Sequence, residues 1–187
     1  MHFTALPLSG AYEIRREPQR DGRGLFTRRF SAALFAERGL ATGFAECSLS
    51  QNQRRGTLRG LHFQQAPYAE TKLVRCARGA AYDVIADLRR GSPTFGRWHA
   101  CEISAANHLI LYIPAGFAHG FQTLRDDTEI DYAITPAYRP EAARGIRHDD
   151  PDLAIRWPLP AGQLSPRDLS LPSLAQALQR PDFPEMR

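Results

Sequence analysis

The chain has 187 residues, of which 43% are hydrophobic and 24% charged, and its formal net charge is +4. Its length favours one domain, and its composition is ordinary for a soluble globular protein. No apolar run reaches the roughly 18 residues that a membrane-spanning helix needs, and the N-terminus lacks the pattern of a secretory signal. The three cysteines have no C-x-x-C spacing, which argues against a disulfide framework or a structural zinc module. We therefore expect a cytoplasmic protein without a membrane partner.

The basic residues are unevenly divided, because Lys72 is the single lysine among 24 lysines and arginines. The arginines are dispersed among acidic residues, which is typical of a solvated surface, so we expect no nucleic-acid partner. A lysine differs from an arginine in presenting a compact ammonium whose pKa can move when it is buried. Composition alone leaves open whether Lys72 is present by chance or for its chemistry.

The predicted elements are short. A helix is predicted over 31–38, with Ser31 as its N-cap and Gly39 just after its end. A second helix is predicted over 172–179, and alternating patterns predict strands over 71–76, 81–88, 108–113 and 128–134. Many short strands with few helices predict a mainly β fold, a jelly-roll β-sandwich or barrel with a few short helices. We expect one domain over 1–180, including the C-terminal helix, and a loose tail over 181–187.

The alternation within the first of these strands concerns the single lysine directly. It places Lys72 on the same face as Val74 and Cys76. A lysine that faces a protein interior is costly unless it is paired, so an inward Lys72 favours a functional role. A phase error of one residue would place Lys72 in solvent instead, and both alternatives stay open at this point.

The stretch over 54–64 carries the first candidate for proton chemistry. It contains Arg59 between two glycines, and His62 follows on what is predicted to be a strand. An imidazole can take and return a proton near neutral pH. The alternative is a core histidine that is bonded to the backbone. Lys72 lies ten residues further on, within reach of His62 if both strands line one interior.

A second histidine lies in the segment 113–121, among one proline and two glycines. This pattern predicts a tight corner with exposed backbone around His119, which is more typical of a site than of a packed strand. Hydrogen bonding within a turn is the alternative role. His62, Glu70 and His119 also form a His–His–carboxylate set of the kind that can hold iron. A metal-dependent enzyme is therefore a second interpretation of the same residues.

Several motifs occur in order along the chain: Asp21-x-Arg23-Gly24-x-Phe26, Leu58-Arg59-Gly60-Leu61-His62-Phe63-Gln64, Lys72-Leu73-Val74-Arg75, Tyr82-Asp83-Val84, Gly116-Phe117-Ala118-His119-Gly120-Phe121 and Leu164-Ser165-x-x-Asp168. In these motifs the chain resembles the nucleotide-sugar 3,5-epimerases, the dTDP-4-dehydrorhamnose 3,5-epimerase family of metal-free cupins. The resemblance covers residues 21–168. It implies a cupin-type jelly roll and an isomerase that needs neither a metal ion nor another cofactor.

The resemblance also implies a reaction on a nucleotide-linked 4-keto-6-deoxyhexose, whose C3 and C5 hydrogens are acidified by the C4 ketone. His62 resembles the base that removes such a proton, and Asp168 resembles the carboxylate that orients its imidazole. Lys72 would stabilise the enolate oxygen at C4. Tyr132 would return a proton on the opposite face of the sugar and so invert the centre.

Further roles follow from the same resemblance. Arg23 and Arg59 would bind the diphosphate through their forked guanidinium groups. His119 and Tyr138 would contact sugar and phosphate. Phe26 would stack on the nucleobase from the partner subunit of a homodimer.

Two questions about the substrate stay open. Family members that use dTDP commonly have a glutamate where this chain has Arg28, and an arginine suits acceptor-rich base edges. We therefore expect Arg28 to favour a CDP- or GDP-linked sugar, with a silent change at a rim position as the alternative. An enzyme that inverts only C3 or only C5 would look almost the same in sequence. The resemblance places the reaction in deoxysugar or cell-surface polysaccharide synthesis.

Overall fold

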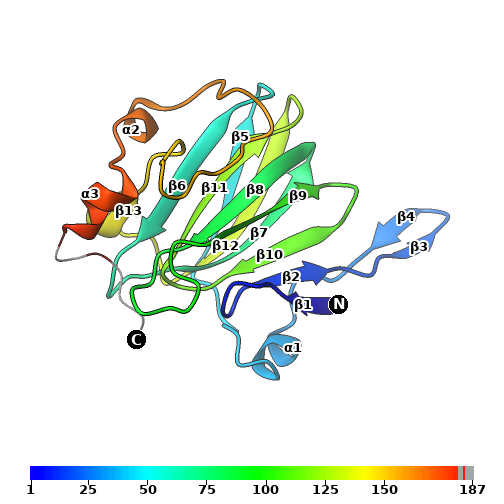
Figure 1. The fold of residues 1–187 in the computed structure, drawn as a ribbon. Coiled ribbons are helices and arrows are strands. Elements are labelled where there is room, and N and C mark those ends of the chain that lie inside the picture. Colours follow the sequence, from blue (N-terminus) through cyan, green and yellow to red (C-terminus); the bar gives the residue numbers. More distant parts are fainter. Residues whose placement is uncertain (181–182, 184–187) are drawn as a thin grey trace.

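The computed structural model describes residues 1–180 and Phe183. Two antiparallel sheets form a β-sandwich (Figure 1). The six-stranded sheet has the order β1-β2-β10-β7-β12-β5, namely His2–Ala5, Tyr12–Arg15, Leu109–Ile113, Thr71–Arg78, Thr128–Thr135 and Glu46–Asn52. The five-stranded sheet has the order β13-β6-β11-β8-β9, namely Ala143–Gly145, Leu58–Gln64, Phe117–Thr123, Ala80–Asp87 and Trp98–Ser104. The predicted jelly-roll architecture is confirmed.

The interior between the sheets is apolar because alternate residues of facing strands point into it. Strands β7, β10 and β12 contribute from one sheet and β8, β9 and β11 from the other, through residues such as Val74, Leu111, Ile130, Ile85 and Phe121. This is the period-two pattern of a sandwich core. The prediction that Lys72, Val74 and Cys76 share an inward face is confirmed, because Val74 and Cys76 belong to the core between the sheets and Lys72 lines a cavity between them.

The outer faces of both sheets are covered as well, which sequence alternation did not indicate. Leu73 and Ile110 lie under Phe35 of helix α1, Ala32–Ala36. The outer face of the five-stranded sheet lies under the C-terminal part of the chain, where Leu174 and Phe183 pack against Phe63 and its neighbours. Strands β6, β7, β8, β10 and β11 are therefore largely buried on both faces.

The helices differ from the predicted ones at their ends. Ser31 is the N-cap residue of α1, as expected, but its side chain makes no capping hydrogen bond. The second predicted helix is α3, Leu174–Leu178, with a complete capping box between Ser173 and Gln176. Of the residues expected to form a loose tail, Phe183 is buried, and the rest lies outside the described residues. No helix in the described part of the chain is long and apolar enough to cross a bilayer.

Several elements escaped the sequence prediction, among them three short ones outside the two sheets or beside the cavity. The four-residue helix α2, Pro166–Leu169, follows a long irregular segment near β6 (Figure 1). A small hairpin of β3, Gln19–Asp21, and β4, Gly24–Phe26, projects away from the sandwich. A 3-10 turn at Pro140–Ala142 precedes β13.

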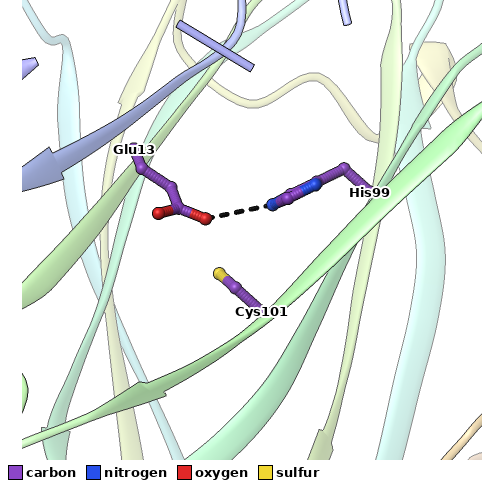
Figure 2. A group of neighbouring side chains, drawn as sticks. All are labelled: Glu13, His99 and Cys101. Atoms are coloured by element: carbon purple, nitrogen blue, oxygen red, sulfur yellow. Dashed lines mark hydrogen bonds and ion pairs between the residues drawn. The ribbon is translucent and has the colours of Figure 1, made fainter. Parts of the chain in front are cut away.

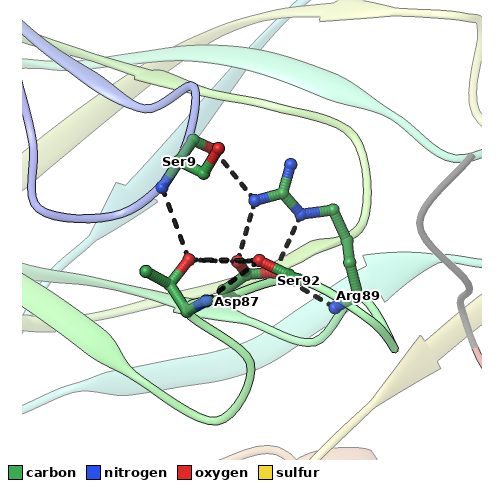
Figure 3. A network of polar contacts seen from close by, with 5 residues as sticks. Ser9, Asp87, Arg89 and Ser92 are labelled. Carbon is green, nitrogen blue, oxygen red and sulfur yellow. Dashed lines mark hydrogen bonds and ion pairs between the residues drawn. The ribbon is translucent and has the colours of Figure 1, made fainter.

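One buried carboxylate fixes the loop after β8. Asp87 is fully buried and accepts hydrogen bonds from Arg89, Ser92 and Thr94 (Figure 3). Burial opposes ionisation of this carboxyl, but these hydrogen bonds hold its pKa below the ordinary value. Arg89 also donates to the backbone carbonyl of Ser9, so the network joins the loop to the N-terminal segment.

Candidate active site

A cavity of about 260 Å³ opens between the two sheets near β5, β6 and β12. Its walls come from both sheets and from the C-terminal segment. The five-stranded sheet contributes His62 and His119, and the six-stranded sheet contributes Lys72 and Tyr132. The other lining residues are Ser48, Leu49, Ser50, Phe63, Gln64, Glu70, Ile134, Tyr138, Ala143 and Arg167.

His62 and Asp168 form a hydrogen-bonded dyad. Nε2 of His62 lies 2.6 Å from Oδ1 of Asp168, which is almost completely buried. Helix α2 holds Asp168, whose backbone N–H donates to the N-cap side chain of Ser165. Burial opposes ionisation of Asp168, but the hydrogen bond and the charge of His62 lead the interactions that lower its pKa. An ionised Asp168 requires a proton on Nε2, which leaves Nδ1 of a neutral His62 free to act as a base.

A bulge brings Arg59 and His62 to the same face of β6. His119 pairs with His62 and Phe121 pairs with Arg59, so three steps along β6 match two along β11. Strict alternation would place residues 59 and 62 on opposite faces, and one extra residue removes that conflict. Gly60 lies in this bulge with a φ of +125°, and a Cβ there would stand 2.5 Å from Cα of Gly120. Gly60 and Gly120 thus allow strands β6 and β11 to approach each other closely.

Lys72 is buried and ion-paired with Glu70. Its Nζ lies 2.7 Å from Oε1 of Glu70 and 3.4 Å from the backbone carbonyl of His62. The position of Lys72 therefore agrees with the alternative in which it faces the interior and has a functional role. The alternative in which Lys72 lies in solvent is wrong. Glu70 supplies the opposite charge that a buried ammonium requires.

His119 lies in the middle of β11, and not in an exposed corner as predicted. The turn is confined to residues 114–116, after which Phe117, His119 and Phe121 alternate toward the interior. Nε2 of His119 is 2.9 Å from Oδ1 of the fully buried Asp83. The imidazole therefore forms a second His–carboxylate pair, in the inner wall of the cavity.

Tyr132 packs edge-on against His119, with 5.8 Å between ring centroids. It faces the cavity from the sheet opposite His62. Burial raises the pKa of the Tyr132 phenol, and the negative charge of Asp83 raises it further. The hydroxyl is therefore protonated at neutral pH and available as a proton donor.

The predicted substrate-binding residues divide into two groups. Tyr138 lines the cavity, and Arg59 is an exposed residue whose Nε donates to Asn52 at 2.8 Å. The other three are all solvent-exposed, on or just after the projecting hairpin, and the structure does not bring them to the cavity of their own chain: Arg23, Phe26 and Arg28. Arg23 is paired with Asp21 at 2.7 Å.

The alternative metal site of His62, Glu70 and His119 does not assemble. Each of these side chains is engaged by a different partner, namely Asp168, Lys72 and Asp83. Among the described residues, a different group is the single one that brings three candidate donor atoms within 4.8 Å of one another, namely Glu13, His99 and Cys101. The prediction of a metal centre at these three residues is therefore wrong.

Several residues of the site were missed at the sequence level. Asp83 is the hydrogen-bond partner of His119, and Asn52 accepts a hydrogen bond from Arg59. Gln64 links the cavity wall to the segments that hold Tyr68 and Arg139. Its side chain accepts from the backbone N–H of Arg139 at 2.6 Å and donates to the carbonyl of Tyr68. The inward phase of Asp83 on β8 was a usable signal, because a lone buried carboxylate requires a partner.

These elements define a class of protein: a jelly-roll enzyme whose cavity is equipped for proton transfer from two opposite walls. A family profile described as dTDP-4-dehydrorhamnose 3,5-epimerase matches residues 5–176. The chain therefore belongs to the dTDP-4-dehydrorhamnose 3,5-epimerase family and is an isomerase, as its motifs indicated.

Individual relatives agree with this assignment. A dTDP-4-dehydrorhamnose 3,5-epimerase of Sinorhizobium fredii is 44% identical over 177 residues, which cover 94% of this chain and 91% of the relative. The crystal structure of NovW, a 4-keto-6-deoxy sugar epimerase from Streptomyces spheroides, superposes with a TM-score of 0.94 at 36% identity and covers 99% of this chain and 93% of NovW. The RmlC epimerase of Legionella pneumophila, solved with dTDP-4-keto-L-rhamnose, gives 0.92 at 35% identity and covers 100% and 98%.

Proposed function

We propose that the cavity inverts C3 and C5 of a dTDP-linked 4-keto-6-deoxyhexose, with His62, Lys72, Tyr132 and Asp168 as its chemical groups. The observation that carries the proposal is that His62 and Tyr132 come from opposite sheets and line one cavity. Inversion of a carbon centre requires a proton to leave on one face and to return on the other. Two proton-transfer groups on opposite walls meet this requirement.

The first step removes a proton. Nδ1 of His62 takes the hydrogen from C3 or C5, and the electron pair of the broken C–H bond moves to the C4 ketone oxygen. Asp168 stabilises the imidazolium that forms. The ammonium of Lys72 stabilises the enolate oxygen, because it is a fixed charge in a site that excludes most water.

The second step returns a proton. The Tyr132 hydroxyl donates to the same carbon from the other face, the C4 ketone forms again, and solvent then returns a proton to Tyr132 and accepts the proton held by His62. The raised pKa of Tyr132 keeps its hydroxyl protonated until the carbanion forms. The step balances without an oxidant or a cofactor, because the ketone of the substrate accepts and returns the electron pair.

The remaining predicted residues would bind the nucleotide part. In the proposal, Arg59, His119 and Tyr138 contact the sugar and the diphosphate from the chain that holds the cavity. Arg23 and Phe26 serve the cavity of a second copy, because the hairpin projects away from its own sandwich. We therefore propose a homodimer, acting in the cytoplasm in deoxysugar or surface polysaccharide synthesis.

The nucleobase is assigned as thymine because the relatives described above are named for dTDP sugars. Arg28, the basis for expecting a CDP- or GDP-linked sugar, is exposed just after the hairpin. The effect of Arg28 on the choice of nucleobase stays a prediction. Turnover of dTDP-, CDP- and GDP-4-keto-6-deoxyglucose by the same enzyme preparation decides it, and a preference for CDP or GDP would overturn the assignment to thymine.

Proton NMR of dTDP-4-keto-6-deoxyglucose in deuterated water tests the reaction. The expected result is enzyme-dependent loss of the signals of both H3 and H5, together with new signals of the inverted sugar. Exchange at one position alone would identify a single-centre epimerase. Absence of exchange at both positions would refute the proposal, since a protein that only binds the sugar exchanges nothing.

A further inference from the structure

Three donor side chains converge at the edge of the sandwich opposite the cavity. Glu13 comes from β2, and His99 and Cys101 come from β9 (Figure 2). Nε2 of His99 lies 3.0 Å from Oε1 of Glu13, and one donor atom of each residue lies within 4.8 Å of the other two. β9 is one edge of the five-stranded sheet, whereas β6 and β13 beside the cavity lie at the other edge.

We propose that Glu13, His99 and Cys101 bind one Zn²⁺ ion, with water as the fourth ligand, and that the ion ties β9 to β2. Imidazole nitrogen, thiolate sulfur and carboxylate oxygen are the three donor types that zinc takes in proteins. Bonds of about 2.0–2.3 Å to a tetrahedral ion separate the ligand atoms by roughly 3.3–3.8 Å. Without an ion, the three donor atoms lie within 4.8 Å of one another, so small side-chain movements would reach this spacing.

The charges and the surroundings of the cluster suit a divalent ion. A carboxylate and a thiolate together cancel the charge of Zn²⁺, which matters because the three residues are only partly exposed. The side chains of Glu13 and His99 are 24% and 23% exposed, which leaves a route for the ion and for its water. As the Zn–S bond forms, the thiol proton leaves to solvent.

The test uses tag-free protein that has been stripped with a chelator and then titrated with Zn²⁺ or with Co²⁺ as a spectroscopic substitute. We expect one Zn²⁺ per chain by equilibrium dialysis, a thiolate-to-cobalt charge-transfer band, and a higher melting temperature with Zn²⁺. Each of three variants should weaken Zn²⁺ binding at least about tenfold, since even outer-shell changes cost this much: Glu13→Gln, His99→Gln and Cys101→Ser. The matched control is Cys47→Ser, which removes an exposed cysteine on β5 and should bind Zn²⁺ like the parent protein.

Three results would overturn the proposal. They are the absence of stoichiometric zinc binding by the parent protein, a cobalt complex without the thiolate band, and unchanged zinc affinity in Cys101→Ser. If Cys101→Ser does not fold, Glu13→Gln decides, because it changes the other sheet and keeps the size of the side chain. None of these readouts depends on the epimerase reaction.

Discussion

Lys72 and Glu70 neutralise each other inside the cavity, and each side chain is only 7% exposed. An ammonium could not remain charged at this depth without such a partner. The pair also restricts where the charge can point, because Glu70 directly precedes β7 and Lys72 is its second residue. At the residue scale, the chemistry of the site therefore depends both on which charged groups are present and on the neighbouring groups that fix their positions.

Replacement of this ammonium by a guanidinium tests the proposed enolate contact. Lys72→Arg should lower kcat by about 10²–10³, because a planar fork cannot replace a compact charge aimed at one oxygen. Circular dichroism and the melting temperature should stay close to those of the parent. Arg78→Lys, at the exposed end of the same strand, is the control and should keep full activity. Near-normal turnover by Lys72→Arg would contradict the role.

We expect the Asp168 carboxylate to affect kcat by fixing the tautomer of His62. Asp168→Asn should reduce kcat by about 10³–10⁴, since an amide can accept or donate and no longer fixes the proton on Nε2. The KM should change much less. Steady-state kinetics on the dTDP-linked ketosugar provides the measurement, and a change in KM alone would assign Asp168 to binding.

The lowered pKa of Asp168 also predicts a dependence of stability on pH. Folding favours its ionised form, so its contribution to the free energy of unfolding is complete above the ordinary value of 3.8. The contribution is lost as the pH falls through the lower pKa of the folded state. Between about pH 6 and pH 3, the parent should therefore lose more stability than Asp168→Asn. Denaturant titration at both pH values measures this difference.

A second aspartate serves as the comparison for that experiment. Asp149 has a pKa lowered to about 2, led by its hydrogen bond from Arg147, but both side chains are about half exposed. Solvent screens such pairs, so Asp149→Asn should alter stability far less at either pH. Equal effects of the two variants would show that burial of the dyad at residue 168 contributes nothing.

At the scale of elements, the N-terminus of the four-residue helix α2 is capped by the side chain of Ser165. Ser165 accepts from the N–H of Asp168 at 3.1 Å, and Ser173 caps α3 in the same way at 3.2 Å from the N–H of Gln176. Ser165→Ala and Ser173→Ala should each cost about 1 kcal/mol of stability. Only Ser165→Ala should also lower kcat, because only that cap positions the carboxylate that we propose orients His62. Equal kcat values for both variants would contradict the link between α2 and the dyad.

The contact between β6 and β11 makes a different prediction. A Cβ on Gly120 would stand 2.7 Å from the carbonyl oxygen of Arg59, whereas a Cβ on Gly43 would meet nothing within 4 Å. Gly120→Ala should therefore destabilise the protein by roughly 1–3 kcal/mol, a typical cost of overpacking, and Gly43→Ala should be nearly neutral. Thermal unfolding of both variants checks this, and equal melting temperatures would show that the strands can move apart freely.

At the scale of the whole molecule, the projecting hairpin predicts that two chains share each site. His62→Ala and Arg23→Ala should each be poorly active when assayed alone. Random reassembly of their mixture makes half of the dimers mixed, and one of the two sites in each mixed dimer is intact. Activity should therefore recover to about a quarter of the parent value. No recovery would mean that the hairpin serves its own chain or none.

The sequence predicted the β architecture and the inward phase of Lys72 because alternation is a local signal. It did not predict the pairing of Lys72 with Glu70 in place of a metal site, and it assigned His119 to a corner because Gly120 was interpreted as a turn residue. Gly120 instead permits close strand contact, which depends on a strand almost 60 positions earlier. A contact such as Glu13–His99 links residues far apart in the chain, so no local pattern carries it, and the equally distant contact of His62 with Asp168 was expected through the family resemblance alone.

The three carboxylates around the cavity have a consequence for the order of binding. Glu70, Asp83 and Asp168 outnumber the single ammonium of Lys72, so the floor of the cavity is anionic when both histidines are neutral. Arg59 and Arg167, by contrast, are exposed. Such a field favours one orientation of a molecule with an uncharged sugar at one end and a diphosphate at the other, namely the orientation in which the sugar enters first. The electrostatic gradient itself thus distinguishes the two ends of the substrate before any specific contact forms.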